Sequence, residues 1–260
     1  MITKYDKLFD LSGKVALITG AGSGLGKAIA EGYTQYGATV ALIDITAQQV
    51  KALADIINQE AGNAVALRCD VSKSKDVKST VAQVIKTFGK IDVLVNNAGI
   101  TKRSKAEEMT DEMWDIMLNI NLKGPFLFSR EVGRHMINRG EGGRIINMAS
   151  IAGIVGLETG NVNYTASKGG LIAMTRCLAI EWAKHNILVN AIAPSQTRTP
   201  MINKLMKEKP EMEEYFVSKI PLGRLGNVSD IVGPAIFLAS DASAFVTGHT
   251  LLVDGGHTVK

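Results

Sequence analysis

Short apolar runs alternate with longer helical patterns along almost the whole chain. Several of these runs are rich in β-branched residues, which is typical of strands that are buried on both faces. They are KVALIT from Lys14, TVALID from Thr39, AVALR from Ala64, IDVLVN from Ile91, GRIINM from Gly143, ILVNAIA from Ile187 and TLLVD from Thr250. The alternation predicts right-handed βαβ units and a doubly wound α/β fold, with a parallel sheet of about seven strands and helices on both faces.

The pattern continues from near residue 14 to near residue 253 without a Pro/Ser-rich linker, a charge block or a short repeat. We therefore expect residues 1–260 to form a single Rossmann-like domain for binding and catalysis. Ligands of open parallel sheets bind beyond the carboxyl ends of the strands. Functional residues are therefore expected directly after the strands.

The composition limits the possible partners. Basic residues are mixed with acidic ones and give a formal net charge of only +4, which argues against nucleic-acid binding. Cys69 and Cys177 lie far apart without CxxC spacing, so neither a disulfide nor a zinc site is indicated. The start of the chain, MITKYDKLFDLSGK, is too polar for a signal peptide, and no apolar run is long enough for a membrane span. We expect a cytoplasmic protein that binds a small molecule, with no metal and no membrane association.

A glycine-rich loop, TGAGSGLG, follows the first predicted strand and precedes a helical pattern. Gly20, Gly24 and Gly26 allow a sharp turn and a close approach to a pyrophosphate, while the helix offers free N–H groups. With Ser23 and Leu25, these residues form a candidate anion cradle; an ordinary tight turn is the alternative. A nucleoside triphosphatase is disfavoured, because the loop lacks the lysine and Ser/Thr pair of a P-loop.

Asp44 ends the second predicted strand and is followed by Ile45. A carboxylate at this position accepts hydrogen bonds from a ribose diol and repels a 2′-phosphate. No Arg or Lys occurs at positions 21–23, where a cation for that phosphate would stand. The sequence therefore favours NAD (NADH) over NADP. The alternative is an Asp that caps the next helix, although Thr46 serves equally well as the N-cap.

Tyr164 and Lys168, in YTASK, lie one helical turn apart on the same predicted face. A phenol is a poor base at neutral pH, since its ordinary pKa is about 10. A neighbouring ammonium and a positive nicotinamide ring favour phenolate, so we expect a lowered pKa and a role as proton shuttle for Tyr164. Ser150, just after the strand GRIINM, is expected to hold the substrate oxygen and to stabilise its developing charge. A surface Tyr–Lys pair and a loop serine are the alternatives.

These motifs together resemble the short-chain dehydrogenase/reductase family. TGAGSGLG is similar to the family's TGxxxGxG, and NNAG at 96–99 to its fourth-strand motif. Ser150 with YTASK is similar to its active site, and NINLKG places Asn121 at its catalytic asparagine. The resemblance covers essentially the whole chain, through LLVDGG. It implies an enzyme that moves hydride between nicotinamide and an alcohol or ketone carbon, usually as a homotetramer.

The resemblance also implies residue roles. Lys168 is expected to bind the nicotinamide ribose, and Asn121 to hold a water that relays protons to Lys168, unless it is a helix asparagine with local bonds only. Asp70 is expected to contact adenine, with a helix cap as the alternative, and Asn97 to border the adenosine ribose. The implied cofactor contacts also include Val71, Ala98, Gly99, Pro194, Thr197 and Thr199.

One position departs from the family pattern. Pro194 is followed by Ser195, where the family usually has glycine. This side chain either tightens the loop beside the nicotinamide or adds a hydroxyl to the pocket.

The charged, Met-rich segment from about 198 to 221 corresponds to the substrate lid of the family. Its Met201 and Met206 either line a pocket or simply pack. Arg103 and Arg198 are candidate partners for a substrate carboxylate, with solvated surface arginines as the alternative.

The segments NNAGITKR, EWAKHNILVNAIAP and GPAIFLASDAS are similar to those of family members that act on gluconate-like sugar acids. We therefore expect NAD-dependent oxidation of a secondary alcohol on a sugar, polyol or sugar acid, or the reverse reduction of the ketone. A reductase of β-keto thioesters and a non-catalytic NAD sensor are the alternatives.

Overall fold

The structure, a computed structural model, describes residues 5, 7–60, 62–156 and 160–260. The first four residues and residue 6 of the N-terminal stretch judged too polar for a signal peptide lie outside the described residues, as do residues 61 and 157–159.

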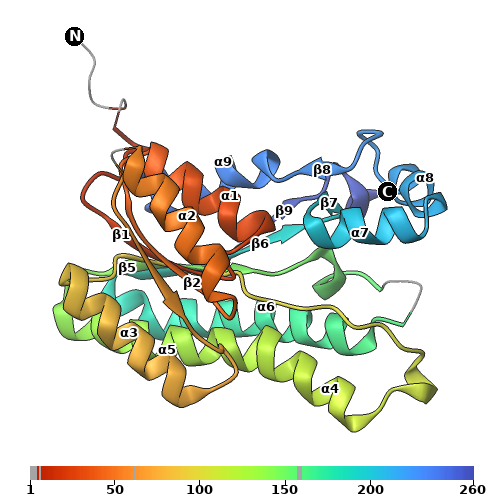
Figure 1. The fold of residues 1–260 in the computed structure, drawn as a ribbon, viewed down its shortest axis with the longest axis horizontal. Helices are drawn as coiled ribbons and strands as arrows, with labels where there is room; N and C mark the ends of the chain where they lie inside the picture. The colour runs from red at the N-terminus through yellow and green to blue at the C-terminus, as the bar shows by residue number, and fades with distance from the viewer. Residues whose placement is uncertain (1–4, 6, 61, 157–159) are drawn as a thin grey trace.

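A parallel sheet forms the middle layer of the protein (Figure 1). Within the described residues its seven strands lie in the order β3 (Ala64–Arg68), β2 (Thr39–Asp44), β1 (Val15–Thr19), β4 (Val93–Asn96), β5 (Gly143–Met148), β6 (Ile187–Pro194) and β9 (Thr250–Val253). This order confirms the predicted doubly wound fold. The strand order reverses between β1 and β4, so the carboxyl ends of these two strands form the crevice where such sheets bind ligands.

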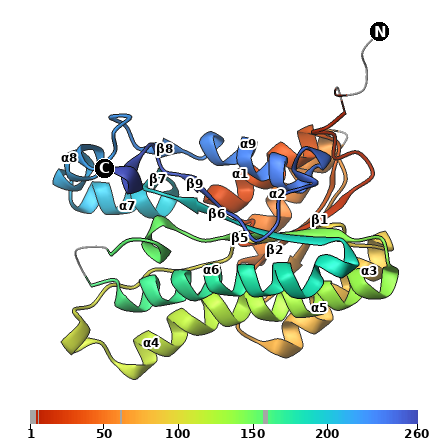
Figure 2. The same ribbon diagram turned by 180° about the vertical axis from the view of Figure 1, so that it is seen from behind.

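Helices cover both faces of the sheet (Figures 1 and 2). One face carries α1 (Gly24–Gln35), α2 (Ala47–Gln59) and α9 (Ser229–Ala239), and the other carries α3 (Ser74–Phe88), α5 (Gly124–Arg139) and α6 (Val162–Trp182). Successive strand residues alternate between the two cores: Ala16 and Ile18 pack toward the first set of helices, and Val15 and Leu17 toward the second. Because both faces are covered, β1 is apolar and buried at every position before Thr19.

Two boundaries differ from the predictions. β4 begins at Val93, two residues later than the apolar run, and the Asp92 carboxylate instead accepts the backbone N–H of Val15 at 2.8 Å. A second, two-stranded sheet of β7 (Thr197–Arg198) and β8 (Gly226–Asn227) was not predicted. Two-residue strands are too short to show a periodic pattern.

The segment predicted as a lid forms α7 (Pro200–Glu208) and α8 (Glu211–Ser218). A small separate core made of Met206, Phe216, Ile220 and Leu225 holds these two helices together. Next to α6, α4 (Asp111–Leu118) continues through a π-helical turn, η2 (Asn119–Lys123), into α5. The remaining short helices are η1 (Ala106–Glu108), η3 (Ile151–Gly153), η4 (Ala183–His185), η5 (Asp241–Ser243) and η6 (His257–Val259).

Among the described helices, none combines the length and the apolar character that a membrane span requires.

Candidate active site

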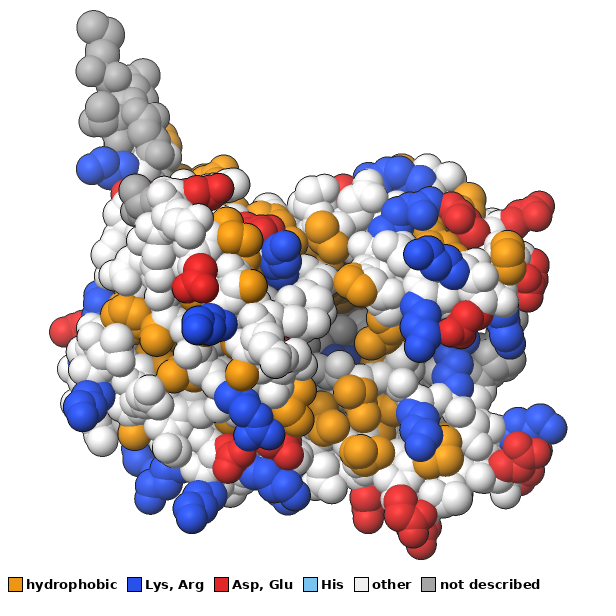
Figure 3. All heavy atoms as spheres, in the orientation of Figure 1, with side chains coloured by type: hydrophobic (Ala, Val, Ile, Leu, Met, Phe, Trp, Pro, Cys, Tyr) orange, Lys and Arg blue, Asp and Glu red, His pale blue; other side chains and the backbone are white. Residues whose placement is uncertain are grey.

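A pocket of about 470 Å³ opens at the carboxyl edge of the sheet. It extends from the glycine loop after β1, past the ends of β4, β5 and β6, to the first residues of α7. Figure 3 shows the hollow near the centre of one face of the molecule, with hydrophobic side chains along its edge. The pocket therefore lies at the place that the strand order predicts for a ligand.

The glycine loop packs backbone against backbone. Gly20 has a φ of +65°, and a Cβ at this position would lie 2.8 Å from the Cα of Ala98. A Cβ on Gly26 would lie 2.2 Å from the carbonyl oxygen of Gly20. Ser23 is the N-cap of α1, but its side chain makes no capping hydrogen bond. The first turn of α1 therefore presents backbone N–H groups to a cradle that a side chain at Gly20 or Gly26 would destroy.

Asp44 fixes this loop to the end of β2. Its carboxylate accepts the backbone N–H of Gly22 at 3.0 Å and that of Thr46 at 2.9 Å, and it lines the pocket. Thr46, not Asp44, is the N-cap of α2. The described residues that line the pocket include one acid, Asp44, and two cations, Arg103 and Lys168, neither of which forms an ion pair with it. Among the described lining residues, Asp44 is therefore an unpaired acid beside the glycine loop.

Asn97 connects β1 to β4 at the point where the strand order reverses. Its side-chain amide donates to the carbonyl oxygens of Thr19 and Gly20, both at 3.0 Å. The Thr19 hydroxyl in turn accepts the backbone N–H groups of Asn97 and Ala98 at 3.0 and 3.1 Å. Asn97 thus lines the pocket and also holds the glycine loop against the end of β4.

The three residues predicted to carry the chemistry meet in this pocket. Lys168 is 5% exposed, and its Nζ donates to the carbonyl oxygen of Met148 at 2.6 Å and lies 5.7 Å from the ring centre of Tyr164. The Ser150 side chain hydrogen-bonds to Tyr164, and its Oγ also accepts the backbone N–H of Ala152 at 3.1 Å. A phenol, an ammonium and a hydroxyl therefore lie around one end of the pocket.

Burial shifts the titration of two of these groups. Desolvation lowers the pKa of Lys168 to about 8. Desolvation also raises the pKa of the Tyr164 phenol above its ordinary value, and this effect exceeds the lowering by the hydrogen bond from Ser150 and by the charge of Arg103. The predicted lowering of the Tyr164 pKa is therefore wrong for the protein on its own, because burial penalises phenolate more than the neighbouring groups favour it.

Asn121 is fully buried in the π-helical turn and connects three segments. Its Oδ1 accepts the backbone N–H of Ile100 at 2.9 Å, and its Nδ2 donates to the Ile100 carbonyl at 2.9 Å and to Ser167 Oγ at 3.3 Å. A Cβ on Gly99 would lie 3.4 Å from Asn121 Oδ1 and 3.7 Å from Lys168 Nζ, so both side chains reach the same point. The bonds of Asn121 are therefore not only local, and π-helical turns occur frequently at functional sites.

Most of the predicted site residues line this pocket together. They are Gly20, Ser23, Gly24, Leu25, Asp44, Asn97, Ala98, Gly99, Arg103, Ser150, Tyr164, Lys168, Pro194, Thr197 and Thr199, with Ser195 and Met201.

A few predicted residues lie outside the pocket lining. Gly26 packs against the carbonyl oxygen of Gly20 and does not face the pocket lining. The side chain of Ile45 is mostly exposed. The Asp70 carboxylate accepts the N–H and the hydroxyl of Ser72 at 3.0 and 2.7 Å and so stabilises a local turn. The N-cap of α3 is Lys73, so Asp70 is not the helix cap considered as its alternative. Val71 is buried against Gly124.

The two candidate arginines have different surroundings. Arg103 lines the pocket close enough to Tyr164 to lower the pKa of its phenol. Arg198 is exposed and forms an ion pair with Glu213 of α8. Of the two arginines, the structure therefore places only Arg103 where it can meet a ligand in the pocket.

Sequence reasoning missed several lining residues. Ile100, Thr101, Ala149 and Gln196 directly follow motifs or strands, so their positions alone were a usable signal. Gln196 is notable because its buried Oε1 has no hydrogen-bond partner among the described residues. The lining also includes Met148 and Ile151, which flank Ala149 and Ser150, and Pro200, Ile202 and Phe216, which lie in the segment predicted as the lid. Thr46, Gln49 and Asn161 complete the lining and carried no local signal for it.

The fold and the pocket define a nicotinamide-dinucleotide-dependent oxidoreductase with a Rossmann-like sheet. The sequence model of the family described as enoyl-(acyl carrier protein) reductase matches residues 20–258. The chain belongs to the short-chain dehydrogenase/reductase family.

Individual relatives differ in their substrates. The chain is 42% identical to an NAD-dependent glycerol dehydrogenase of Listeria innocua, over 98% of each chain. It is also 42% identical to a 3-oxoacyl-[acyl-carrier-protein] reductase of Thermotoga maritima, over 95% of this chain and 98% of that one. Its structure is similar to that of a gluconate 5-dehydrogenase from Burkholderia cenocepacia in complex with NADP and tartrate, with a TM-score of 0.93, 34% identity and 98% of both chains covered.

Proposed function

We propose that the protein is an NAD-dependent dehydrogenase that interconverts a secondary alcohol and a ketone on a polyol, sugar or sugar acid, with residues 1–260 acting as one domain. The observation that carries the proposal is the meeting of Ser150, Tyr164 and Lys168 in one pocket with the glycine loop and Asp44. An NAD sensor without activity needs the loop but has no use for these three side chains together.

The residues present fit a nicotinamide dinucleotide. A side chain at Gly20 or Gly26 would clash with neighbouring backbone, so the loop requires glycine at both positions. The start of α1 offers backbone N–H groups to a pyrophosphate. Asp44 keeps one free lone pair on each carboxylate oxygen for a ribose diol, since each oxygen accepts one backbone N–H. A bound nicotinamide ring supplies a hydride acceptor for alcohol oxidation, or a donor for ketone reduction.

The catalytic side chains have separate roles in binding the substrate oxygen and transferring its proton. Ser150 donates a hydrogen bond to the substrate oxygen and holds it beside Tyr164, which takes up or returns the proton of that oxygen. Below about pH 8, Lys168 carries the ammonium that opposes the burial cost of phenolate. Asn121 keeps the loop after β4 in place near Lys168 through its bonds to Ile100.

The position of Arg103 favours an acidic or polyhydroxylated substrate. Arg103 is exposed and lines the pocket near Tyr164, where its guanidinium can bind a carboxylate or hydroxyls of a short ligand. The relatives that act on glycerol and gluconate are in line with this chemistry. The thioester reductase remains the second candidate, because a relative with that activity is equally identical to the chain.

The substrate class is tested by measuring turnover of a panel of ketones with NADH and of the corresponding alcohols with NAD. We expect turnover of sugar acids and polyols, such as 5-ketogluconate and glycerol, to exceed that of an acetoacetyl thioester. Faster turnover of the thioester would replace this proposal with the second candidate. No turnover of any member would support the sensor.

The cofactor preference is tested with Asp44→Ala. We expect the ratio of kcat/KM for NAD to that for NADP to fall by about 10- to 100-fold, since hydrogen bonds to a charged group are lost together with the repulsion of a 2′-phosphate. Asp55→Ala, on the exposed side of α2, is the matched control and should leave the ratio unchanged. An unchanged ratio in Asp44→Ala would contradict the assignment of NAD.

We also propose that the enzyme works as a cytoplasmic homotetramer. Trp114, Ile116, Phe126 and Ile180 are exposed on α4, α5 and α6, and these side chains offer apolar surface for contacts between copies. Both cysteines are free, as expected in a reducing compartment. A monomeric mass in light scattering would contradict the assembly and leave the reaction unaffected.

A further inference from the structure

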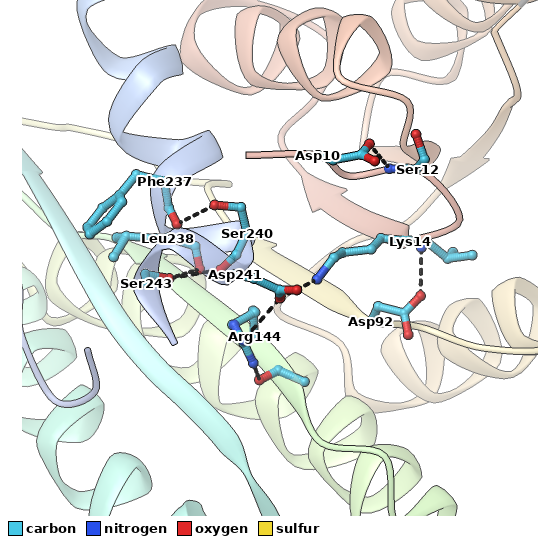
Figure 4. A network of polar contacts seen from close by, with 12 residues as sticks. Asp10, Ser12, Lys14, Asp92, Arg144, Phe237, Leu238, Ser240, Asp241 and Ser243 are labelled. Atoms are coloured by element: carbon cyan, nitrogen blue, oxygen red, sulfur yellow. Dashed lines mark hydrogen bonds and ion pairs between the residues drawn. The ribbon is translucent and has the colours of Figure 1, made fainter. Parts of the chain in front are cut away.

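A second hollow lies at the amino ends of the strands, on the opposite edge of the sheet from the active site. Its volume is about 330 Å³, and it is enclosed by the loops that precede β1, β4, β5 and β6 and by η5. Figure 4 shows part of this hollow around Lys14, Asp92, Arg144 and Asp241. Six residue steps along β1 separate Lys14 from Gly20, so the two cavities lie about 20 Å apart.

The described lining of this hollow contains four cations and three carboxylates. The cations are Lys14, Lys90, Arg139 and Arg144, and the carboxylates are Asp92, Glu141 and Asp241. Such a surplus of positive charge in a polar, concave surface attracts anions.

Part of the cluster is an ordinary structural network. Arg139 contacts Asp92 at 2.9 Å and donates to the carbonyl oxygen of Gly142 at 3.2 Å. Asp92 also accepts the N–H of Val15 and contacts Lys90 at 3.0 Å. These groups tie the starts of β1, β4 and β5 together. The Nε of Arg139 also has no hydrogen-bond partner among the described residues, but it lies 3.2 Å from a carboxylate oxygen of Glu141.

Arg144 is different, because its guanidinium is buried without adequate partners. Its side chain is 12% exposed, and its Nε has no hydrogen-bond partner among the described residues. It donates to the carbonyl oxygen of Gly143 at 3.3 Å, and its contact with Asp241 is 3.6 Å long. Asp241 is 67% exposed and makes a shorter contact, 3.1 Å, with Lys14. Unsatisfied donors on a buried cation are costly, and a folded protein rarely keeps them without a ligand or a solvent partner.

We propose that this hollow binds the phosphate group of inorganic phosphate or of a small phosphomonoester, with Arg144 and Lys14 as its main partners. Lys14 precedes β1 and Arg144 stands near the start of β5, and both side chains reach Asp241 Oδ1 (Figure 4), so an oxyanion at that point receives donors from both. The competing carboxylates, Asp241 and Glu141, are two-thirds exposed and can turn toward solvent when the anion enters. A phosphate then satisfies the guanidinium that Asp241 reaches only at long distance.

The binding is tested by thermal unfolding with saturating NADH, which keeps phosphate out of the glycine loop. Millimolar inorganic phosphate should raise the melting temperature by about 2 °C or more relative to chloride at equal ionic strength. Arg144→Gln should abolish the rise. Arg134→Gln, which changes an exposed arginine on α5, should keep it. An equal rise in wild type and Arg144→Gln, or no rise in wild type, would overturn the proposal.

A second measurement avoids any folding defect of the variant. Lysines of the NADH-saturated wild-type protein are acetylated with and without phosphate and mapped by mass spectrometry. Labelling of Lys14 and Lys90 should fall by about threefold or more near saturation, while that of the exposed lid residue Lys204 stays constant. Equal labelling of Lys14 in both conditions would place the phosphate elsewhere.

A third arm separates the two sources of the phosphate group. Protection of Lys14 at lower concentrations of glycerol 3-phosphate than of inorganic phosphate would identify a phosphomonoester as the ligand. The opposite order would identify inorganic phosphate.

Discussion

The floor and the lid of the active-site pocket are built in different ways. The floor, formed by the glycine loop and the ends of β4 and β5, is held by backbone contacts, by the half-buried Asn97 and by the buried Asn121. The lid, formed by β7, α7 and α8, is held by a small core of its own and by the exposed ion pair between Arg198 and Glu213. The floor therefore tolerates little change, whereas the lid can move and vary.

This difference separates the two tasks of the enzyme. Cofactor and proton chemistry depend on the floor, where a shift of a fraction of an ångström matters. In the function proposed above, substrate choice depends on what the lid and Arg103 add above the floor. Substitutions in the floor should therefore have large effects on catalysis or stability, and substitutions in the lid small ones.

The largest effect is expected for Tyr164→Phe. Removal of the phenolic oxygen should lower kcat by about 10²- to 10⁴-fold, the usual contribution of a general acid or base. NADH binding, measured by fluorescence, should stay within a few-fold of wild type. Tyr36→Phe, at an exposed position, serves as the matched control. Turnover of Tyr164→Phe at the wild-type rate would remove the proton-transfer role.

The next effect is expected for Gly26→Ala in the floor. The new Cβ would lie 2.2 Å from the Gly20 carbonyl oxygen, so the variant should lose about 1 to 3 kcal/mol of unfolding free energy and bind NADH more weakly. Gly233→Ala, in α9, meets nothing within 4 Å and should be neutral or slightly stabilised. Urea unfolding measures both variants. Equal stability of the two variants would contradict the tight packing of the floor.

Lys168→Met tests whether the buried lysine in the floor lowers the free energy of unfolding. The folded-state pKa of Lys168, about 8, lies below its unfolded value of 10.5, so protonated Lys168 destabilises the folded protein below about pH 8. The penalty disappears as the pH rises from about 8 to 10.5.

The inactive Lys168→Met variant should therefore be more stable than wild type at pH 7, by about 1 to 3 kcal/mol, with a smaller gap at pH 10. Urea unfolding at the two pH values measures this gap. Lys27→Met, at an exposed position, should show little change at either pH. A Lys168→Met variant less stable than wild type at pH 7 would show that Lys168 does not strain the fold.

The smallest effects compare the two arginines. Arg103→Gln should raise KM for a sugar acid by about tenfold, the loss expected for one charge-assisted hydrogen bond, with a smaller change for an uncharged polyol. Arg198→Gln should change KM by less than about threefold, since exposed ion pairs contribute at most about 1 kcal/mol. Steady-state kinetics with both substrates checks the pair. A larger effect of Arg198→Gln would assign the lid a direct role in binding.

The same division explains what the sequence could predict. The seven strands were visible because β1 and its neighbours are apolar on both faces, and Gly20, Asp44 and Tyr164 stand in motifs fixed by backbone geometry. Arg198 could not be separated from Arg103, because the partner of Arg198, at the end of β7, is Glu213, fifteen residues away in α8. Gln49 reaches the pocket only through tertiary packing, and its own sequence neighbourhood carries no sign of it. Phe216 lies in the segment predicted as the lid, but nothing in that segment distinguishes it from its neighbours.

The Tyr164 pKa shows a further limit. The spacing of Tyr164 and Lys168 indicates that the two groups are neighbours, but burial, which a local pattern does not reveal, decides the direction of the shift.

The central claim is that Ser150, Tyr164 and Lys168 surround the reactive end of a nicotinamide bound at the glycine loop. A crystal structure of the protein with NADH and a sugar-acid ligand tests it most directly. The account predicts the Tyr164 and Ser150 oxygens about 3 Å from the reacting oxygen of the ligand, above the nicotinamide ring. A phenol turned away from the ring, with Ser150 out of reach, would contradict it.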